Sequence, residues 1–328
     1  MRIAITGSIA TDHLMTYKGR FADSLVVDQL DKIALSFLVE DLEIRRGGVA
    51  ANIAFGMANL GQQPILVGAV GEDFGDYRSW LERHGVDCDS VRVSETRHTA
   101  RFVCTTDDRM AQIATFYAGA MSEAREIELG PIAVRVGGLD LAVISSNDPE
   151  AMLRHTQECR TRKIAFAADP SQQLAFMDGE SIRELIDGAT YLFTNEYEAA
   201  LTEQKTGWSR DEIAERVQTR IITKGKNGAL ITTRGEPPIL VTIAHEVCKA
   251  DPTGVGDAFR AGFLSGLAWG LGQERSAQMG SMLATYVVET VGTQEYQLGR
   301  QRFLERFTLA YGAQACTEIE PHLTCPRP

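Results

Sequence analysis

The chain has 328 residues, with 33 Lys and Arg against 44 Asp and Glu, so its formal net charge is −11. At 44% hydrophobic and 23% charged residues it has the composition of a globular protein, long enough for one large α/β domain with or without a smaller one. The negative charge argues against nucleic acid or an anionic membrane as a partner, because both need a surplus of Lys and Arg.

Short apolar runs bounded by Gly, Asp or Asn are typical of strands buried on both faces, and they occur at residues 3–6, 64–68, 141–145, 164–168, 191–194, 220–223 and 229–232. Segments of helical periodicity lie between several of them, at residues 50–60, 77–84, 150–162, 180–187 and 210–216. This alternation predicts a three-layer α/β/α domain around a mostly parallel sheet. Ligands bind such sheets beyond the carboxyl ends of the strands, so we expect the site in loops that follow strands.

Two stretches, 13–45 and 99–117, break the alternation with mixed or alternating polar and apolar residues. They predict half-exposed strands that pair into a small β-sheet lid over the site. The main domain is then expected over residues 1–12, 46–98 and 118–312. The tail 313–328, which contains three prolines, is expected to be loosely ordered.

The cysteines are scattered, with no CxxC pair or Cys/His cluster, at Cys88, Cys104, Cys159, Cys248, Cys316 and Cys325. This spacing predicts reduced thiols in a cytoplasmic protein and no structural zinc site. The first apolar run is too short for a secretion signal, and no run approaches the ~20 residues of a membrane span.

The segment from Asp251 to Phe259 carries the strongest chemical signal. Gly254 and Gly256 leave backbone N–H groups uncovered where a helix begins, and a helix N-terminus favours an anion. Asp257 lies in the first turn of that predicted helix. The segment predicts a phosphate cradle with a carboxylate beside it, although a simple cap or turn has the same pattern.

A second glycine pair, Gly47 and Gly48, precedes another predicted helix and is followed by Asn52. Paired glycines allow a ligand to approach the backbone closely, and an Asn side chain offers both a donor and an acceptor. The alternative is an ordinary helix start with a satisfied Asn.

Three further features bear on the ligand that such a site would bind. Asp12 follows the first strand, where a carboxylate can accept hydrogen bonds from the vicinal hydroxyls of a sugar. Phe102 and Phe116 on the lid can stack on a flat base, and the amides of Gln172 and Gln173 can bind its edge. The two rings could equally be the apolar face of the lid or a dimer seam.

Taken together, the segments resemble the PfkB/ribokinase family of carbohydrate and nucleoside kinases. The likeness rests on four motifs in the family's order and covers roughly residues 1–312: Gly-Gly-x-x-x-Asn at 47–52, Asn-x-x-Glu at 195–198, Thr-x-Gly-x-x-Gly at 223–228 and Asp-x-Thr-Gly-x-Gly-Asp at 251–257. It implies a ribokinase-like fold and ATP as phosphate donor.

The resemblance also implies roles for single residues. Asp257 is then the base, and the amides of Gly254, Val255 and Gly256 form the anion hole. Asn195 and Glu198 organise Mg²⁺ and the phosphates, with Glu198 acting through water, although a helix capped by Asn195 is the alternative. The remaining implied contacts are to the nucleotide, from Thr223, Gly225 and Gly228, and to a monovalent cation such as K⁺, from Asp251, Thr253 and carbonyls near Gly292.

Within the family the chain looks most like actinobacterial-type adenosine kinases, on segments 1–14, 35–39, 95–102, 116–125, 169–174 and 254–263. That likeness implies phosphorylation of the 5′-hydroxyl of adenosine by a homodimer paired through its lids. The implied nucleoside site comprises Ser8, Asp12, Ser36, Gly48, Asn52, Phe102, Phe116, Gln172, Gln173 and Asp257. A sugar kinase acting on ribose or fructose, and a non-catalytic nucleoside-binding protein, are the alternatives.

One departure from the family pattern concerns positive charge. Many sugar kinases of the family carry Lys directly after the glycine pair, where this chain has Val49. The charge that meets the phosphates must therefore come from elsewhere, and Arg109 in the predicted lid is a candidate.

Overall fold

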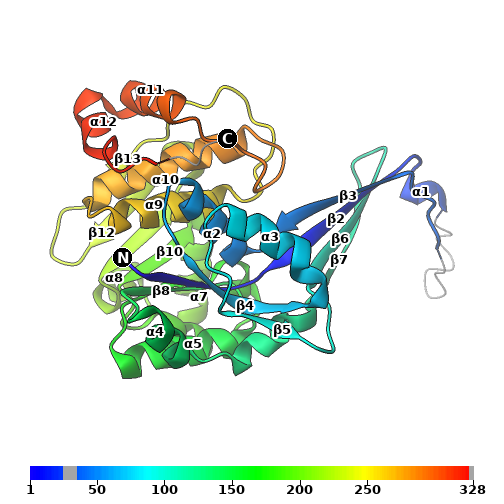
Figure 1. The fold of residues 1–328 in the computed structure, drawn as a ribbon, viewed down its shortest axis with the longest axis horizontal. Coiled ribbons are helices and arrows are strands. Elements are labelled where there is room, and N and C mark those ends of the chain that lie inside the picture. The colour runs from blue at the N-terminus through cyan, green and yellow to red at the C-terminus, as the bar shows by residue number, and fades with distance from the viewer. Residues whose placement is uncertain (25–34, 325–328) are drawn as a thin grey trace.

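The computed structural model describes residues 1–24 and 35–324. In this part of the chain a nine-stranded sheet has the order β13-β12-β11-β10-β9-β8-β1-β4-β5 (Figure 1). Its strands are parallel except that β12 runs antiparallel to both β11 and β13. They are β1 (Ile3–Thr6), β4 (Ile65–Gly71), β5 (Val91–Ser94), β8 (Leu141–Ser145), β9 (Phe166–Asp169), β10 (Tyr191–Asn195), β11 (Thr219–Thr223), β12 (Ala229–Thr233) and β13 (Ile239–Val241).

Helices cover both faces of this sheet, because successive side chains of a strand point to opposite sides. In β1, Ile3 and Ile5 join one apolar cluster and Ala4 joins the other. The first cluster contains residues of α2 (Val49–Asn59), α3 (Gly75–Arg83), α9 (Val255–Ala268), α10 (Gln273–Val288), α11 (Arg300–Tyr311) and α12 (Ala313–Ile319). The second contains residues of α4 (Leu129–Val136), α5 (Pro149–Arg162), α6 (Gly179–Ile186) and α8 (Arg210–Arg216), and α7 (Glu196–Thr206) packs beside it. The predicted three-layer, mostly parallel α/β/α fold is confirmed.

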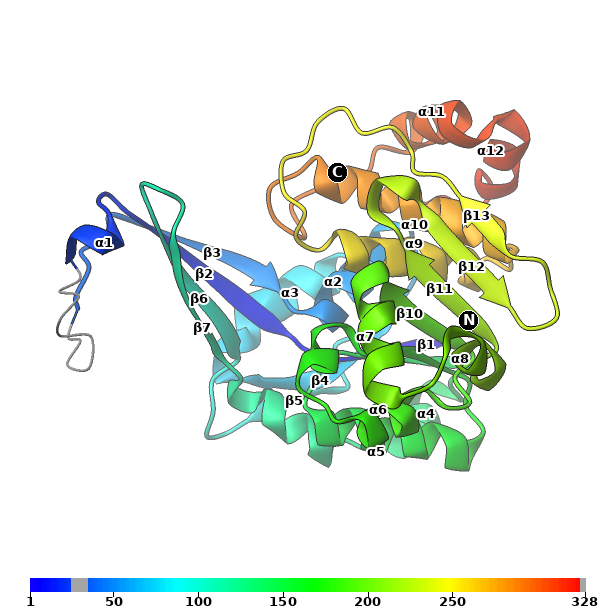
Figure 2. The same cartoon turned by 180° about the vertical axis from the view of Figure 1, so that it is seen from behind.

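A second sheet of order β3-β2-β6-β7 projects from one side of this body (Figure 2). We call it the lid; it consists of β2 (Ala10–Tyr17), β3 (Asp41–Gly47), β6 (Ala100–Asp107) and β7 (Gln112–Tyr117), with the short helix α1 (Phe21–Ser24) near its tip. β2 begins at Ala10 and β3 ends at Gly47, so lid strands extend into both ranges that we expected in the main domain. Residues 35–40, expected as part of a strand, are not in one, and our expectation for 25–34 lies outside the described residues.

The C-terminal segment differs from the expectation of a loosely ordered tail. Residues 313–319 form α12, and Ile319 and Leu323 are buried in the first apolar cluster. Burial of these two side chains ties the segment to the body, so a loose tail is wrong for residues 313–324. No helix among the described residues is long and apolar enough to cross a bilayer.

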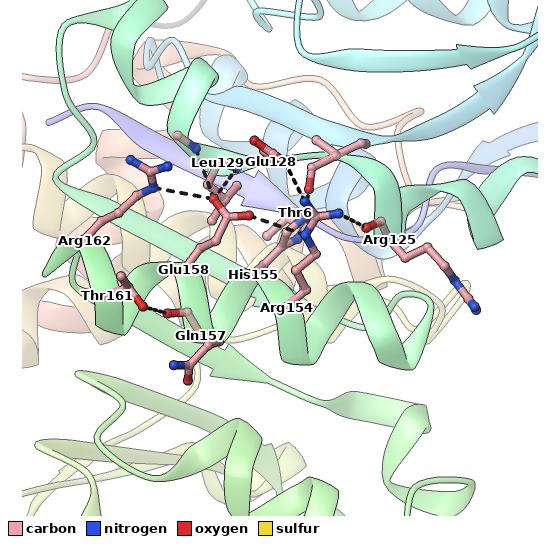
Figure 3. A network of polar contacts seen from close by, with 12 residues as sticks. Thr6, Arg125, Glu128, Leu129, Arg154, His155, Gln157, Glu158, Thr161 and Arg162 are labelled. Carbon is pink, nitrogen blue, oxygen red and sulfur yellow. Dashed lines mark hydrogen bonds and ion pairs between the residues drawn. The ribbon is translucent and has the colours of Figure 1, made fainter.

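A polar network joins α5 to the start of α4 and to β1 (Figure 3). Glu158 accepts hydrogen bonds from the backbone N–H groups of Leu129 and Gly130, which begin α4. The buried His155 ring contacts Thr6 Oγ1 through Nδ1 at 2.8 Å and the Ile127 carbonyl through Nε2 at 3.1 Å. Because a carbonyl can only accept, Nε2 carries the proton and Nδ1 accepts from Thr6. Thr6 ends β1, so this network holds the strand that leads into the site.

His155 makes the stability of the fold depend on pH. Burial lowers its pKa from 6.5 to about 4, so the neutral ring stabilises the fold fully above pH 6.5, and this contribution is lost as the pH falls toward 4. We expect wild-type protein to lose about 3 kcal/mol more unfolding free energy than a His155→Gln variant between pH 7 and 4. Urea titrations of both proteins across this range measure the difference, and parallel curves would contradict it.

Candidate active site

A cavity of about 710 Å³ lies where the lid meets the carboxyl ends of the central strands. Residues from the loop after β1, the start of α2, the lid, the loop after β9, the start of α7 and the start of α9 line it. A second cavity of about 330 Å³ adjoins it and shares Thr223 and Gly256 with it. The position agrees with the rule that ligands bind parallel sheets beyond the carboxyl ends of their strands.

Four lid residues that line the larger cavity form one row across the four strands. Arg45 pairs with Asp12, Asp12 with Phe102, and Phe102 with Phe116, each directly opposite the next in register. Paired residues on neighbouring strands point to the same face of a sheet, so the row presents a guanidinium, a carboxylate and two rings side by side. Burial raises the pKa of Asp12 to about 6, against the opposing charge of Arg45.

The glycine-rich segment at 254–257 forms the start of α9. Gly254 is its N-cap with φ 75°, and a Cβ there would lie 2.8 Å from Thr293 Cγ2, so both conformation and space require glycine. No acceptor for the N–H groups of Gly254 or Gly256 is found in the described residues, whereas the Val255 N–H points to the Pro252 carbonyl at 3.4 Å. The helix start therefore has donors directed away from the fold, as an anion site requires.

Asp257 lies next to these donors and accepts a hydrogen bond of 2.9 Å from Asn52 Nδ2 on α2. Burial raises its pKa to about 6, while Arg260 and the Asn52 bond oppose the increase. A carboxylate whose pKa lies close to neutrality, at the wall of a cavity, has the properties of a general base.

The glycine pair at the start of α2 allows Asn52 to reach Asp257. Gly48 has φ 94°, and a Cβ on it would lie 2.6 Å from the Ser8 carbonyl. Ser8 in turn caps the helix, because its Oγ accepts from the Val49 N–H at 3.0 Å. The loop after β1 and the start of α2 are thus in backbone contact, which places Asn52 at the cavity wall.

Arg260 supplies positive charge one helical turn after Asp257. Its guanidinium is buried and forms an ion pair of 2.6 Å with the buried carboxylate of Asp169 at the end of β9. Its Nη1 lies 2.9 Å from where a Cβ of Gly256 would be, so glycine at this position leaves room for the guanidinium. The Arg260 guanidinium therefore lies against the backbone at the start of α9.

Asn195 and Glu198 form a capping box at the start of α7. Each side chain accepts from the backbone N–H of the other residue, at 2.8 Å in both cases. This is the alternative that the sequence left open, yet both residues also line the larger cavity. Burial raises the pKa of Glu198, although the charge of Arg260 opposes the increase.

A magnesium ion at these residues would have to be held mainly through water. The described residues contain no cluster of three or more His, Cys, Asp or Glu that could form a protein cage. One Glu198 oxygen is used by the capping box, so the other is left for a hydrated ion. Mg²⁺ keeps several waters and is usually bound through one or two carboxylates and substrate phosphates, so Glu198 fits this role.

The two oxygens of Asp251 accept from the backbone N–H groups of Thr253 and Gly292, at 2.9 and 3.1 Å. Arg45 adds a guanidinium 3.7 Å from the second oxygen. These partners lower the pKa of Asp251, although burial opposes them. Because Asp251 already has these partners, a cation at Asp251 and Thr253 stays a prediction.

Residues 10–298 match the pfkB family of carbohydrate kinases. The chain belongs to this family. A nucleoside kinase from Methanocaldococcus jannaschii is 31% identical over 250 residues, which are 76% of this chain and 80% of that protein.

The fold is also similar to solved structures of a Burkholderia thailandensis nucleoside kinase. The structure in complex with inosine has a TM-score of 0.82 and 34% identity, covering 95% of this chain and 99% of that one. The structure described as a complex with ADP-inosine has a TM-score of 0.80 and 36% identity, with 95% and 96% of the chains covered.

Most of the residues expected in the site of this pfkB-family protein line one of the two cavities. The larger is lined by Ser8, Asp12, Gly48, Asn52, Phe102, Phe116, Gln172, Gln173, Asn195, Glu198, Thr223, Asp251, Thr253, Gly254, Gly256 and Asp257. The smaller is lined by Thr223, Gly225, Gly228, Val255 and Gly256. Ser36 is exposed outside both, in the stretch that forms no strand. Arg109 is exposed in the β6–β7 turn and lines neither, and the positive charges that line the larger cavity are Arg45, Arg46 and Arg260 instead.

Sequence reasoning missed Arg260, Thr293 and Gln294. A signal for Arg260 was present, since it is a lone charge three residues after Asp257 in an apolar helical pattern. The contacts of Thr293 and Gln294 with Asn52 span 241 and 242 residues, and no local pattern marks them.

The Arg260–Asp169 pair leads to a prediction about stability. Arg260→Met leaves a buried carboxylate without its partner and should lower the unfolding free energy by about 3–5 kcal/mol. Adding Asp169→Leu removes that carboxylate and should restore most of the loss. Chemical denaturation of the single and double variants measures both steps. Equal stability of Arg260→Met and the double variant would show that Arg260 does not compensate the buried charge of Asp169.

Proposed function

We propose that this protein is an ATP-dependent kinase that phosphorylates the 5′-hydroxyl of a nucleoside. The observation that carries the proposal is the lid row, which turns a carboxylate and two aromatic rings into the cavity that also contains Asp257. A carboxylate can hold vicinal ribose hydroxyls, and the rings can stack on a base. A free sugar has no base, so it would use the carboxylate but not the rings. The nucleoside kinases from M. jannaschii and B. thailandensis support the same acceptor class.

In the proposed reaction Asp257 accepts the proton of the acceptor hydroxyl as the new oxygen–phosphorus bond forms. The bond between the γ-phosphorus and the bridging oxygen breaks, and ADP leaves with that oxygen. Proton transfer of this kind needs a base in its ionised form, and the raised pKa of Asp257, about 6, makes it a better proton acceptor while leaving it ionised at neutral pH.

Charge on the transferring phosphoryl group is balanced by groups already in place. The free N–H groups of Gly254 and Gly256 point outward from the start of α9, and the Arg260 guanidinium lies beside them. Such preorganised donors stabilise developing charge without rearranging during the reaction. Together they take the place of the Lys that many relatives carry where this chain has Val49.

The nucleotide is proposed to lie along the smaller cavity, with Thr223, Gly225 and Gly228 against it. Mg²⁺, held through water by Glu198 and near Asn195, would neutralise phosphate charge when bound. A K⁺ requirement at Asp251 stays a prediction that assays with and without K⁺ can check.

Adenosine is our proposed acceptor within the nucleosides, from the resemblance to adenosine kinases. Inosine competes with it, because a related nucleoside kinase was solved with inosine. The family's carbohydrate kinases make ribose or fructose the second candidate. Product identification with Mg·ATP and a panel of adenosine, inosine, guanosine, cytidine, ribose and fructose tests this order. Turnover of free sugars alone would overturn the nucleoside proposal.

Asp257→Asn removes the base and keeps the size of the side chain. Turnover of the best acceptor should fall by about 10²-fold or more, while nucleoside binding measured by calorimetry stays within a few-fold of wild type. Wild-type turnover in this variant would remove Asp257 from the mechanism.

The lid is also proposed to pair with the lid of a second copy. Among the residues that the structure describes, no helical layer covers the lid, and its edge strands β3 and β7 expose Leu42, Ile44, Ile113 and Tyr117. Exposed apolar side chains on unpaired edges favour association. Two roles are therefore open to Phe102 and Phe116: stacking on the nucleobase of the acceptor, or packing between the two lids.

Phe102→Ala separates the two roles. If the ring stacks on a base, KM for nucleosides should rise by about tenfold and KM for any accepted free sugar should change little, with the mass in solution unaltered. A dimer seam predicts instead a lower mass by sedimentation and equal losses for both kinds of acceptor.

A further inference from the structure

Behind the Asn52–Asp257 contact lies a chain of hydrogen bonds that begins at the half-buried indole of Trp80. Trp80 Nε1 on α3 donates to Gln294 Oε1 at 3.1 Å. An indole N–H can only donate, so the Gln294 oxygen must face Trp80 and its amide nitrogen must face the other way. Gln294 is 1% exposed, so water has little access to compete for either end.

The polarity set at Trp80 passes through Gln294 to Asn52. Gln294 Nε2 donates to Asn52 Oδ1 at 3.0 Å and to the Tyr77 hydroxyl at 2.6 Å. Because Asn52 Oδ1 is held by this donor, Asn52 Nδ2 is the group left to face Asp257 Oδ2, at 2.9 Å. Side-chain amides look alike by shape, and only their partners decide which end is which.

The other neighbours of Asn52 cannot decide its orientation. Thr293 Oγ1 lies 2.9 Å from Asn52 Oδ1 and 3.0 Å from the Arg46 carbonyl, but a hydroxyl can turn and act as donor or acceptor. Tyr77 accepts from Gln294 and donates to the Gly47 carbonyl at 2.9 Å, so it ties the same amide to the glycine turn. Trp80, which can only donate, and the Gly47 carbonyl, which can only accept and acts through Tyr77, therefore impose the same orientation on Gln294.

We propose that Trp80 and Gln294 are positioning residues for the reaction: they hold the Asn52 amide with its NH₂ group, and not its oxygen, toward Asp257. The proposal rests on Asp257 as the base of the proposed kinase. Without the relay the amide can turn over, and its oxygen can then accept a hydrogen bond from a protonated Asp257. The relay thus denies the protonated, inactive carboxyl a partner.

Other charges also face Asp257, namely Arg260 on its own helix, Asp169 at the end of β9 and Glu198 on α7. None of them contacts Trp80 or Gln294 in the polar contacts of the described residues. Arg46 lies over the Trp80 ring at 4.2 Å, and both Trp80→Phe, which keeps an aromatic ring, and Gln294→Met leave this cation in place. The pH profile of the Gln294 variant therefore reports on Asp257 through Asn52.

The test uses Gln294→Met, which keeps the length of the side chain without its amide, and Trp80→Phe, which keeps an aromatic ring without its N–H. Gln294→Met should move the acidic limb of the kcat–pH profile upward by about 0.5–1 unit, and Trp80→Phe should move it in the same direction by less, because Tyr77 still holds the Gln294 amide. KM for the nucleoside should change less than about threefold in both variants. The double variant should shift no further than Gln294→Met alone, because both changes break one relay. Trp269→Phe, at the far end of α9, is the matched control and should leave the limb in place.

Unchanged acidic limbs in both single variants, or a shift in the double variant equal to the sum of the single shifts, would overturn the relay. A purely structural role would lower the melting temperature and reduce kcat equally at all pH values. Titration of ¹³C-labelled aspartate carboxyls in protein without substrate, with Asp257→Asn for assignment, should give the same shifts. This measurement decides the relay even if no acceptor is turned over, which would count against the proposed function alone.

Discussion

The hydrogen bond from Asn52 to Asp257 joins the first turns of two helices, and the rest of the site depends on how closely those helices approach. α2 packs on α9 at Gly56, where a Cβ would lie only 2.6 Å from the Cβ of Ala261. α9 meets α10 in the same way at Gly262. Small residues at these crossings bring both helix starts to one end of the sheet, where both line one cavity.

The lid contributes chemistry because of its pairing and not because of any local motif. Asp12, Phe102 and Phe116 come from three strands, and direct register places them next to each other. A shift of one residue in any pair would turn one of them away from the cavity. The outer strands of the lid have exposed apolar side chains, so the sheet that we propose to bind the acceptor also has the apolar surface that the proposed pairing needs.

Much of the site could be read from the sequence, since its chemistry is concentrated in short motifs. Gly254, Gly256 and Asp257 predicted an anion site with a carboxylate, and the structure brings them to a cavity with Asn52. Asn195 and Glu198 show the limit of that reading. Their capping box is visible in the spacing, but the spacing says nothing of whether the same carboxylate also lines a cavity. The prediction of a loosely ordered tail from residue 313 relied on its prolines and did not consider Ile319 and Leu323, whose side chains are buried in the first apolar cluster.

By itself the sequence determined the alternation of strands and helices, the two glycine-rich helix starts and the carboxylate beside one of them. These features depend on periodicity and on the conformations that glycine allows, which act over a few residues. Only the tertiary structure decided that Arg260 pairs with Asp169 and that Gln294 orients Asn52. Each of these contacts joins side chains far apart in the chain, and its energy comes from burial and geometry that no local pattern encodes.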